Sequence, residues 1–312
     1  MATSSARPRP ASSPGAASRR AGGAGDDLVQ ALLPECRLPP AGTAVTCAVS
    51  GGADSLALLV LATAAGCAVT AIHVDHGLRP GSAREADVVA AAAQRFGARF
   101  MAESVELAPG PNLEARAREA RYGVLPRGTL TGHTADDQAE TVLLNIVRGA
   151  ALDGLAGFSL ENRPLHRLRR RDTVAVCEAV GLDPVVDPSN LDPAFRRNRV
   201  RHELMPLLDD IAERDVAAVL ARQAEILRAD VVLLDSLAAA LDPTDAKQIA
   251  AAPEPLARRA IRQWLRSGDE QHPPDAATVE RVLVVARGGA AACEVGDGRS
   301  VRRSRGRLSI EG

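Results

Sequence analysis

Short apolar runs alternate with longer amphipathic segments through the first half of the chain. Residues 44–49 have the length and composition of a buried strand, and residues 68–74 and 99–104 repeat the pattern, the last more weakly. Between them, residues 56–65 and 83–96 are long enough for helices, and a glycine ends each. This alternation predicts an α/β fold with an open parallel sheet and helices on both faces.

The second half of the chain has a different pattern. A short strand is expected at residues 129–132, and Thr134 is placed to cap the helix that follows. Beyond Pro206 the apolar spacing is helical over residues 207–241, 256–265 and 276–286. Residues 293–310 alternate loosely around two turns, which is typical of a small hairpin element. We therefore expect a disordered tail, an α/β domain and a small, mainly helical C-terminal domain, at residues 1–27, 28–205 and 206–312.

Composition narrows the classes of protein that fit. The net charge of −1 indicates no overall field for nucleic acid, so any such surface must be local. Lys247 is the single lysine, which excludes the common nucleotide loop that needs a lysine after its second glycine. The five cysteines form no CxxC pair, which argues against a disulfide framework or a cysteine zinc site. With no secretory signal or membrane-length apolar run, we expect a cytoplasmic protein that does not contact membranes.

A glycine turn follows the first predicted strand. Residues 50–55 read Ser-Gly-Gly-Ala-Asp-Ser and lead directly into the first predicted helix. Adjacent glycines allow close approach of an anion to the backbone, and the free N–H groups of a helix N-terminus favour phosphate. The hydroxyls of Ser50 and Ser55 add donors, while Asp54 suits a magnesium ion that bridges phosphates. The alternative is an ordinary strand–turn–helix, which a bare Ser-Gly-Gly would equally fit.

Polar residues cluster where other strands end. Asp75, His76 and Arg79 follow the second strand, and ligands of open α/β sheets bind beyond the carboxyl ends of strands. A polar loop is the alternative interpretation. Glu114 and Arg118 are spaced to share one helix face, which fits either a binding surface or a solvated salt-bridged face.

Three carboxylates lie in or near the first turn of the helix after Thr134. Asp136 and Asp137 are adjacent there and Glu140 follows, a set suited to magnesium or to an amine substrate. Two arginine-rich runs, at 163–171 and 196–201, fit solvated faces or phosphate-backbone contacts equally well.

Several segments agree, in order, with one known family. They include Ser-Gly-Gly-Ala-Asp-Ser at 50–55, Gly-His-Thr-Ala-Asp-Asp-Gln-Ala-Glu-Thr at 132–141 and Phe-Arg-Arg-Asn-Arg-Val-Arg-His at 195–202, with shorter matches at 73–79, 114–122, 163–165 and 187–190. The first resembles the PP-loop of N-type ATP pyrophosphatases. The whole series, from about residue 45 to 206, resembles tRNA(Ile)-lysidine synthetase.

The resemblance implies both a fold and a reaction. The fold would be adenine-nucleotide alpha-hydrolase-like, with the C-terminal domain docking tRNA. With ATP and Mg²⁺, such an enzyme joins free L-lysine to C2 of the wobble cytidine of tRNA(Ile) with anticodon CAU. The cytidine is first adenylated, and AMP and pyrophosphate are released, so that the tRNA reads AUA as isoleucine.

Site roles follow from the resemblance and from the chemistry of the side chains. Asp54, Asp136 and Asp137 would be catalytic, and Asp54 and Asp136 would hold magnesium. ATP would contact Ser50, Gly51, Gly52, Ala53, Asp54, Ser55, Asp75, His76 and Arg79. Lysine and cytosine would contact Glu114, Arg118, Asp137 and Glu140, and tRNA would contact Arg196, Asn198, Arg199, Arg201 and His202. A homodimer is left open.

Three rival functions remain. A thiolating tRNA enzyme with the same loop usually needs paired cysteines near the site, and this chain has none. An amide-forming synthetase for a small metabolite would release pyrophosphate without tRNA. A non-catalytic RNA-binding protein would release none.

Overall fold

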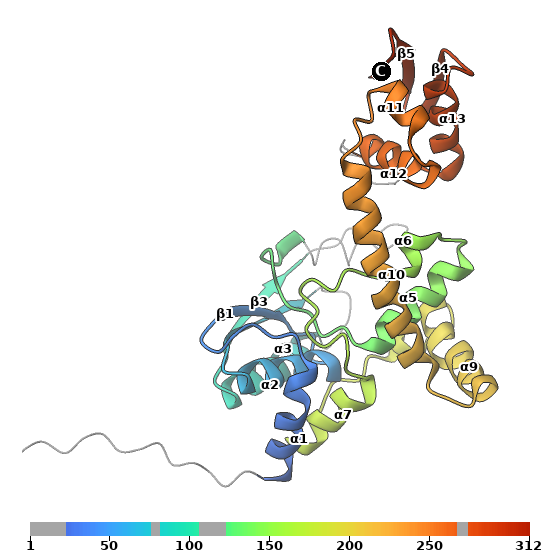
Figure 1. Cartoon of the computed structure of the whole chain (residues 1–312). Helices are drawn as coiled ribbons and strands as arrows, with labels where there is room; N and C mark the ends of the chain where they lie inside the picture. The colour runs from blue at the N-terminus through green and yellow to red at the C-terminus, as the bar shows by residue number, and fades with distance from the viewer. Residues whose placement is uncertain (1–22, 76–81, 106–122, 267–273) are drawn as a thin grey trace, which may run out of the picture. The chain divides into compact units, whose positions relative to one another are not determined.

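The computed structural model in Figure 1 describes residues 23–75, 82–105, 123–266 and 274–312. Contacts divide the chain into two compact units. The first combines residues 1–132 with 170–185, and the second combines 133–169 with 186–312. The expected linear boundary at residue 205 does not separate these units, and it stays a prediction.

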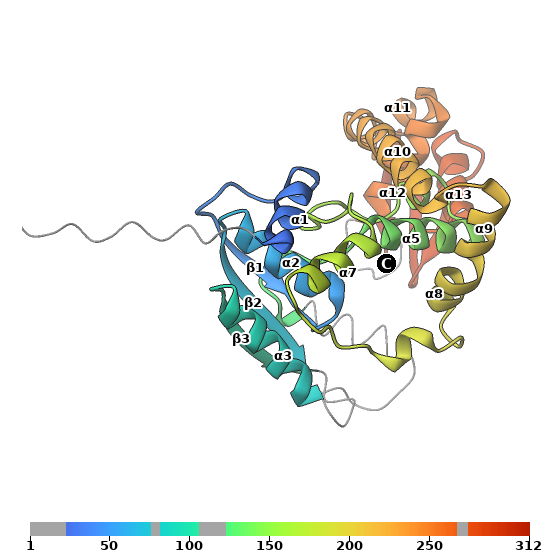
Figure 2. The same ribbon diagram turned by 90° about the horizontal axis from the view of Figure 1, so that it is seen from below.

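The first unit is built on a three-stranded parallel sheet (Figure 2). The strands β1 (Ala44–Ala48), β2 (Ala68–Asp75) and β3 (Arg99–Ser104) lie in that order. Leu130 forms a single parallel bridge to Cys47, so the strand expected at 129–132 is reduced to one bridge. The sheet is flanked by helices, which confirms the predicted α/β class.

The helices of this unit are α1 (Ala24–Leu32), the 3₁₀ turn η1 (Leu33–Glu35), α2 (Ala53–Ala64), α3 (Ser82–Arg95) and α7 (Arg170–Ala179). Residues 55–62 of α2 are all buried, as expected for a helix that is apolar on every side. Helix α7 packs against α1 and α2 although it comes far later in the chain. The sequence did not predict α7, because its first turn is charged.

The second unit is mainly helical. Its helices are α5 (Ala135–Val147), α6 (Leu152–Leu155), the turn η2 (Pro188–Leu191), α8 (Arg196–Arg199), the π-helical turn η3 (Val200–Leu204), α9 (Met205–Ala212), α10 (Val216–Ala239), α11 (Ala246–Ala251), α12 (Glu254–Leu265) and α13 (Ala276–Ala286). Helix α10 contacts α5, α6 and α9 as well as α12. Buried side chains of α11, α12 and α13 form a core with the C-terminal strands. No helix in the described ranges is both long and apolar enough to cross a bilayer.

Two features of this unit differ from the sequence-based expectation. The helical pattern beyond Pro206 is split, because Glu213 adopts a left-handed conformation (φ 48°) and Asp215 caps a new helix. The C-terminal strands β4 (Ala292–Gly296), β5 (Arg299–Ser304) and β6 (Arg307–Glu311) form two successive hairpins instead of one. Both turns place two consecutive residues at positive φ, which matches the twist of antiparallel strands.

Removing the cap of α11 will destabilise the C-terminal core. The carboxylate of Asp245 accepts hydrogen bonds from the backbone N–H groups of Lys247 and Gln248. Asp245→Ala should lower the free energy of unfolding by about 1 kcal/mol. Asp230→Ala, an exposed substitution inside α10, is the matched control and should leave the urea midpoint unchanged. Equal midpoints for the two variants would contradict the capping role.

Candidate functional site

The glycine turn lies between β1 and α2, as the sequence predicts. Gly51 has φ +86°, which only glycine adopts without strain, and Gly52 is the extended residue before the helix. The carbonyl of Gly51 accepts a hydrogen bond from Val185 N at 2.9 Å. Gly132 has no room for a Cβ beside the Asp54 backbone. The turn is therefore held in one conformation by neighbouring backbone.

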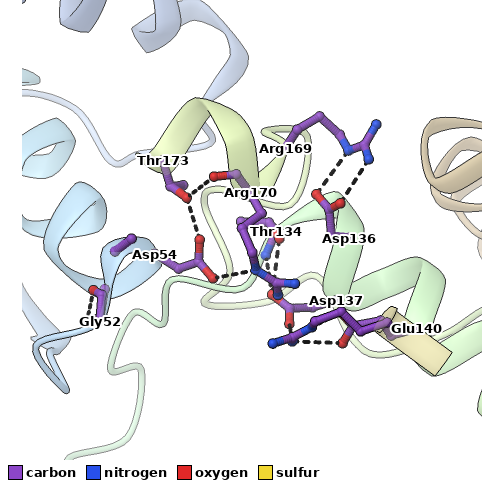
Figure 3. Close-up of polar contacts among 12 residues, drawn as sticks. Gly52, Asp54, Thr134, Asp136, Asp137, Glu140, Arg169, Arg170 and Thr173 are labelled. Atoms are coloured by element: carbon purple, nitrogen blue, oxygen red, sulfur yellow. Dashed lines mark hydrogen bonds and ion pairs between the residues drawn. The ribbon is translucent and has the colours of Figure 1, made fainter. Parts of the chain in front are cut away.

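The hydroxyl of Ser55 closes the turn on itself. Its Oγ donates to the carbonyl of Gly52 at 2.9 Å and accepts from Ser50 N at 3.1 Å (Figure 3 shows the Gly52 contact). The Oγ of Ser50 lies 3.3 Å from that of Ser55. Both hydroxyls thus lie at one place on the loop, at the N-terminus of α2, where backbone N–H groups favour an anion.

Asp54 in the first turn of α2 is held by α7. Its carboxylate accepts a hydrogen bond from the Thr173 hydroxyl and pairs with Arg170 Nε at 3.3 Å (Figure 3). The side chains of this pair are 27% and 26% exposed, so solvent still reaches the carboxylate. The Asp54 carboxylate, whose oxygens are of the type that ligates metal ions, therefore lies beside the glycine turn in a fixed orientation.

Asp136 in the first turn of α5 makes a bidentate contact. Arg169 donates from Nε to Oδ2 at 2.9 Å and from Nη2 to Oδ1 at 2.8 Å. Arg169 also pairs with Asp215 at the start of α10. The Asp136 side chain is 21% exposed, so one guanidinium orients this carboxylate without covering it.

Asp137 and Glu140 are more deeply buried on the same helix. Asp137 accepts from the backbone N–H of Thr134 at 2.9 Å, which satisfies the helix N-terminus (Figure 3). Glu140 is 2% exposed and receives Arg197 Nε and Arg201 Nε, each at 2.7 Å. Arg197 also reaches Asp137 at 3.2 Å. Two carboxylates and two guanidiniums thus form a charge-balanced cluster, defined here as the α5 ion cluster.

The other residues predicted to contact tRNA fall into two groups. Asn198 is buried and donates to the carbonyls of Ser189 and Asp192, at 2.7 and 2.9 Å, so it fixes the segment around η2. The His202 ring contacts the carbonyl of Asn190 at 3.1 Å. Arg196 and Arg199 are exposed, and Arg199 pairs with Glu203. The exposed pair is available to a large partner, whereas the buried amide is a positioning group.

Of the remaining predicted residues, one lies where it was expected and four fall outside the described ranges. Asp75 ends β2, at the carboxyl end of the sheet, as expected. The predictions for His76, Arg79, Glu114 and Arg118 fall outside the described residues.

The sequence interpretation missed the groups that hold the carboxylates. Arg169, Arg170 and Arg197 were noted only as parts of arginine-rich runs, and Thr173 was not noted at all. Their partners lie 33 to 119 positions away along the chain, so no local spacing pattern identifies them.

The carboxylate oxygens of this region are the type of ligand that a magnesium ion prefers. Mg²⁺ prefers oxygen ligands and is commonly held by one or two carboxylates together with substrate phosphates. Asp54 and Asp136 each offer one oriented, partly exposed carboxylate. No group of three or more His, Cys, Asp or Glu side chains that could cage a metal occurs in the parts of the chain that the structure describes. Each of the two carboxylates, taken by itself, fits an ion that is held mainly through phosphate.

Comparison with known proteins identifies both halves of the chain. The PP-loop domain family matches residues 29–208, and the TilS substrate binding domain family matches residues 245–309. The fold of the U34-tRNA thiolase NcsA from Methanococcus maripaludis is similar, with a TM-score of 0.51 and 19% identity over 65% of this chain and 78% of that one. That likeness concerns the fold alone.

Two curated relatives are much more similar in sequence. The tRNA(Ile)-lysidine synthase of Nocardia farcinica is 41% identical over 88% of this chain and 93% of its own length. The protein of the same name from Rhodococcus erythropolis is 44% identical over 72% of this chain and 74% of its own. These matches confirm the resemblance drawn from the motifs, and they show that the chain belongs to the tRNA(Ile)-lysidine synthase family, whose members are tRNA-modifying ligases with a PP-loop ATP-binding domain.

Proposed function

We propose that this protein ligates free L-lysine to C2 of the wobble cytidine of tRNA(Ile) with anticodon CAU, using ATP and forming AMP and pyrophosphate. The family supports a tRNA substrate and the use of ATP. The glycine turn carries the proposal, because a preformed, lysine-free cradle of serines and backbone amides suits pyrophosphate as a leaving group.

In the first step the cytosine O2 attacks the α-phosphorus of ATP, and pyrophosphate leaves with the electrons of the α–β bridging bond. Ser50 to Ser55, as one turn, bind the pyrophosphate portion, and Asp75, His76 and Arg79 border the nucleotide. Asp54 and Asp136 would hold magnesium, which supplies charge neutralisation at the phosphates. Arginines and backbone amides stabilise the developing charge, since no lysine is present in this region.

In the second step the ε-amine of lysine attacks C2, and AMP leaves with the former O2. The amine must lose its protons, and Asp136 or Asp137 accepts one. Glu114, Arg118, Asp137 and Glu140 are proposed to line the lysine and cytosine site. Because Glu140 is already bound by two arginines, we assign it to shaping that wall, with the amine held by the less enclosed carboxylates.

The partners follow from the same reaction. The residues proposed to close the site or contact tRNA are Arg196, Asn198, Arg199, Arg201 and His202. The C-terminal domain is proposed as a second docking surface. We propose a cytoplasmic protein, because its tRNA and lysine substrates are found there. A homodimer is a further proposal that sedimentation would test.

The direct experiment combines the protein with ATP, Mg²⁺, labelled lysine and a CAU-anticodon tRNA(Ile) transcript, followed by nucleoside analysis. The proposal expects one labelled lysidine per tRNA and one AMP per lysidine. Pyrophosphate release driven by a small carboxylate without tRNA would instead support the amide-forming alternative. Incorporation of labelled sulfur would support the thiolase alternative.

Three of the cysteines should resist alkylation. This result would distinguish the proposed ligase from an enzyme that uses a cysteine thiol in catalysis. Burial raises the pKa of the Cys47 thiol to about 12, with the neighbouring Cys67 adding to the effect. Burial likewise raises the pKa of Cys36 to about 12 and of Cys177 to about 11. Thiolate is therefore scarce at pH 8. Iodoacetamide should label these three thiols far more slowly in the folded protein than in guanidinium, by mass spectrometry. Rapid labelling of one of them would favour the thiolase alternative.

A further inference from the structure

We propose that Phe158, with Arg163 on one face of its ring and His133 beside it, is the stacking platform for the target nucleobase. This inference rests on the proposed function, because a base that is modified by an enzyme must leave the anticodon stack and be held elsewhere. All three residues belong to the second unit.

The three side chains form a cluster around the Phe158 ring. The guanidinium carbon of Arg163 lies 4.3 Å from the centroid of the Phe158 ring, which is a cation–π contact. The His133 ring lies 5.5 Å from the same centroid with its plane tilted by 58°. Each of the three is partly exposed. Bases stack on aromatic rings and on guanidinium planes alike, so this cluster has the chemistry of a nucleobase site.

The platform is next to the proposed reaction centre. His133 directly precedes Thr134, the cap of α5, and Asp136 and Asp137 occupy the first turn of that helix. Aromatic side chains are scarce in this chain, with four Phe, one Tyr and one Trp in 312 residues. Phe158 is therefore one of only six such rings in the sequence, and its backbone contacts Gln138 of the helix that carries these carboxylates.

The backbone around Phe158 is fixed from two sides. Its N–H donates to Oε1 of Gln138 at 3.1 Å, and Gln138 is 2% exposed within α5. Arg228 of α10 donates to the carbonyls of Ala156 and Phe158. Gly157 has φ +68° and lies so close to the Gln138 amide that a Cβ would collide with it. The ring is thereby placed relative to α5 before any ligand arrives, as a preorganised binding site requires.

The surrounding charge also suits a nucleotide. Arg228 donates a hydrogen bond to the carbonyl of Phe158, and Arg163 lies over the Phe158 ring, so two guanidinium groups lie near the ring. Burial and the nearby Arg163 both lower the pKa of Arg228. Glu225 partly offsets them, and Arg167 pairs with it at 3.1 Å. Phosphodiester groups on either side of a displaced base would be attracted to this positive charge.

A double-mutant cycle of binding affinities, which combines protein variants with two RNAs, tests the proposal. The two RNAs are a CAU-anticodon tRNA(Ile) and the same tRNA with an abasic nucleotide at the wobble position, each bound in the presence of α,β-methylene ATP. Wild-type protein should bind the intact tRNA about tenfold more tightly than the abasic one. In Phe158→Ala and in the milder Phe158→Leu, that ratio should fall several-fold, because only the intact RNA loses a stacking partner.

Phe96→Leu is the matched control. Phe96 is also partly exposed and carries a cation–π contact, with the Arg95 guanidinium carbon 5.3 Å from its ring, but it belongs to the first unit. This variant should keep the tenfold ratio. The proposal is overturned if Phe158→Leu weakens both RNAs equally, or if wild-type protein does not distinguish them. Failure of the proposed function would be seen separately, as wild-type protein that binds the tRNA yet forms no lysidine.

Discussion

Replacing Arg201 by methionine will lower the free energy of unfolding by about 3 kcal/mol, because it removes one partner of a buried ion pair. Glu140 is 2% exposed and receives Arg201 Nε at 2.7 Å and Nη2 at 3.1 Å. Without this guanidinium the α5 ion cluster keeps two carboxylates and only Arg197 to balance them. Urea unfolding followed by circular dichroism measures the loss.

Two further variants distinguish the effect of removing one partner of a buried ion pair from the effect of removing a charge. Arg199→Met removes an arginine of the same segment, but its partner Glu203 is exposed, so the urea midpoint should not change. Glu140→Met combined with Arg201→Met should be more stable than the sum of the two single losses predicts, because methionines pack where the pair was. An unchanged midpoint for Arg201→Met alone would show that the cluster does not support the fold.

Asp136→Asn should lower lysidine formation by about two to four orders of magnitude, because it removes a proposed magnesium ligand and one of the two carboxylates proposed as general base. The amide keeps the shape of the side chain, so it still accepts one hydrogen bond from Arg169, and the fold should remain. Formation of AMP and of lysidine, each per tRNA, is the measurement. The urea midpoint and the circular dichroism spectrum report that the fold is intact.

Asp210→Asn is the matched control, since Asp210 is an exposed aspartate of α9 and is not a member of the α5 ion cluster. It should turn over at the wild-type rate. Normal turnover by Asp136→Asn would reject the assigned role. Loss of activity together with loss of the fold would assign Asp136 to structure, with Arg169 and Asp215 as its partners.

Local signals explain what could be predicted from the sequence. The run at 44–49 contains β1, and residues 50–52 form the glycine turn, as predicted. Both predictions were possible because the strand, the glycine turn and the buried helix are each encoded by neighbouring residues. The cap at Thr134 was predicted for the same reason. The family resemblance depended on these segments, and so did the fold class.

Long-range pairing explains what could not be predicted. The arginine runs were interpreted as solvated or RNA-facing, yet Arg197 and Arg201 lie on carboxylates about 60 positions away. Charge alone does not tell an inward guanidinium from an outward one. Helix α7 was missed because its apolar face, with Val176 and Cys177, follows a charged first turn. The proposed role of Arg201 in tRNA binding stays a prediction.

The turn at Glu213 shows a third kind of limit. A non-glycine residue in the left-handed conformation leaves no mark in a helical pattern, so α9 and α10 were predicted as one stretch. The tertiary contacts of Asp215 with Arg169 favour the break, and those contacts depend on the folded chain.

In the proposed reaction, AMP departs from the cytidine with the base's own oxygen. The most direct measurement uses tRNA(Ile) carrying ¹⁸O at O2 of the wobble cytidine, with ATP, Mg²⁺ and lysine, and determines the mass of the AMP released. We expect one ¹⁸O atom in each AMP, with one pyrophosphate formed for each lysidine. Unlabelled AMP, or formation of ADP instead, would contradict it.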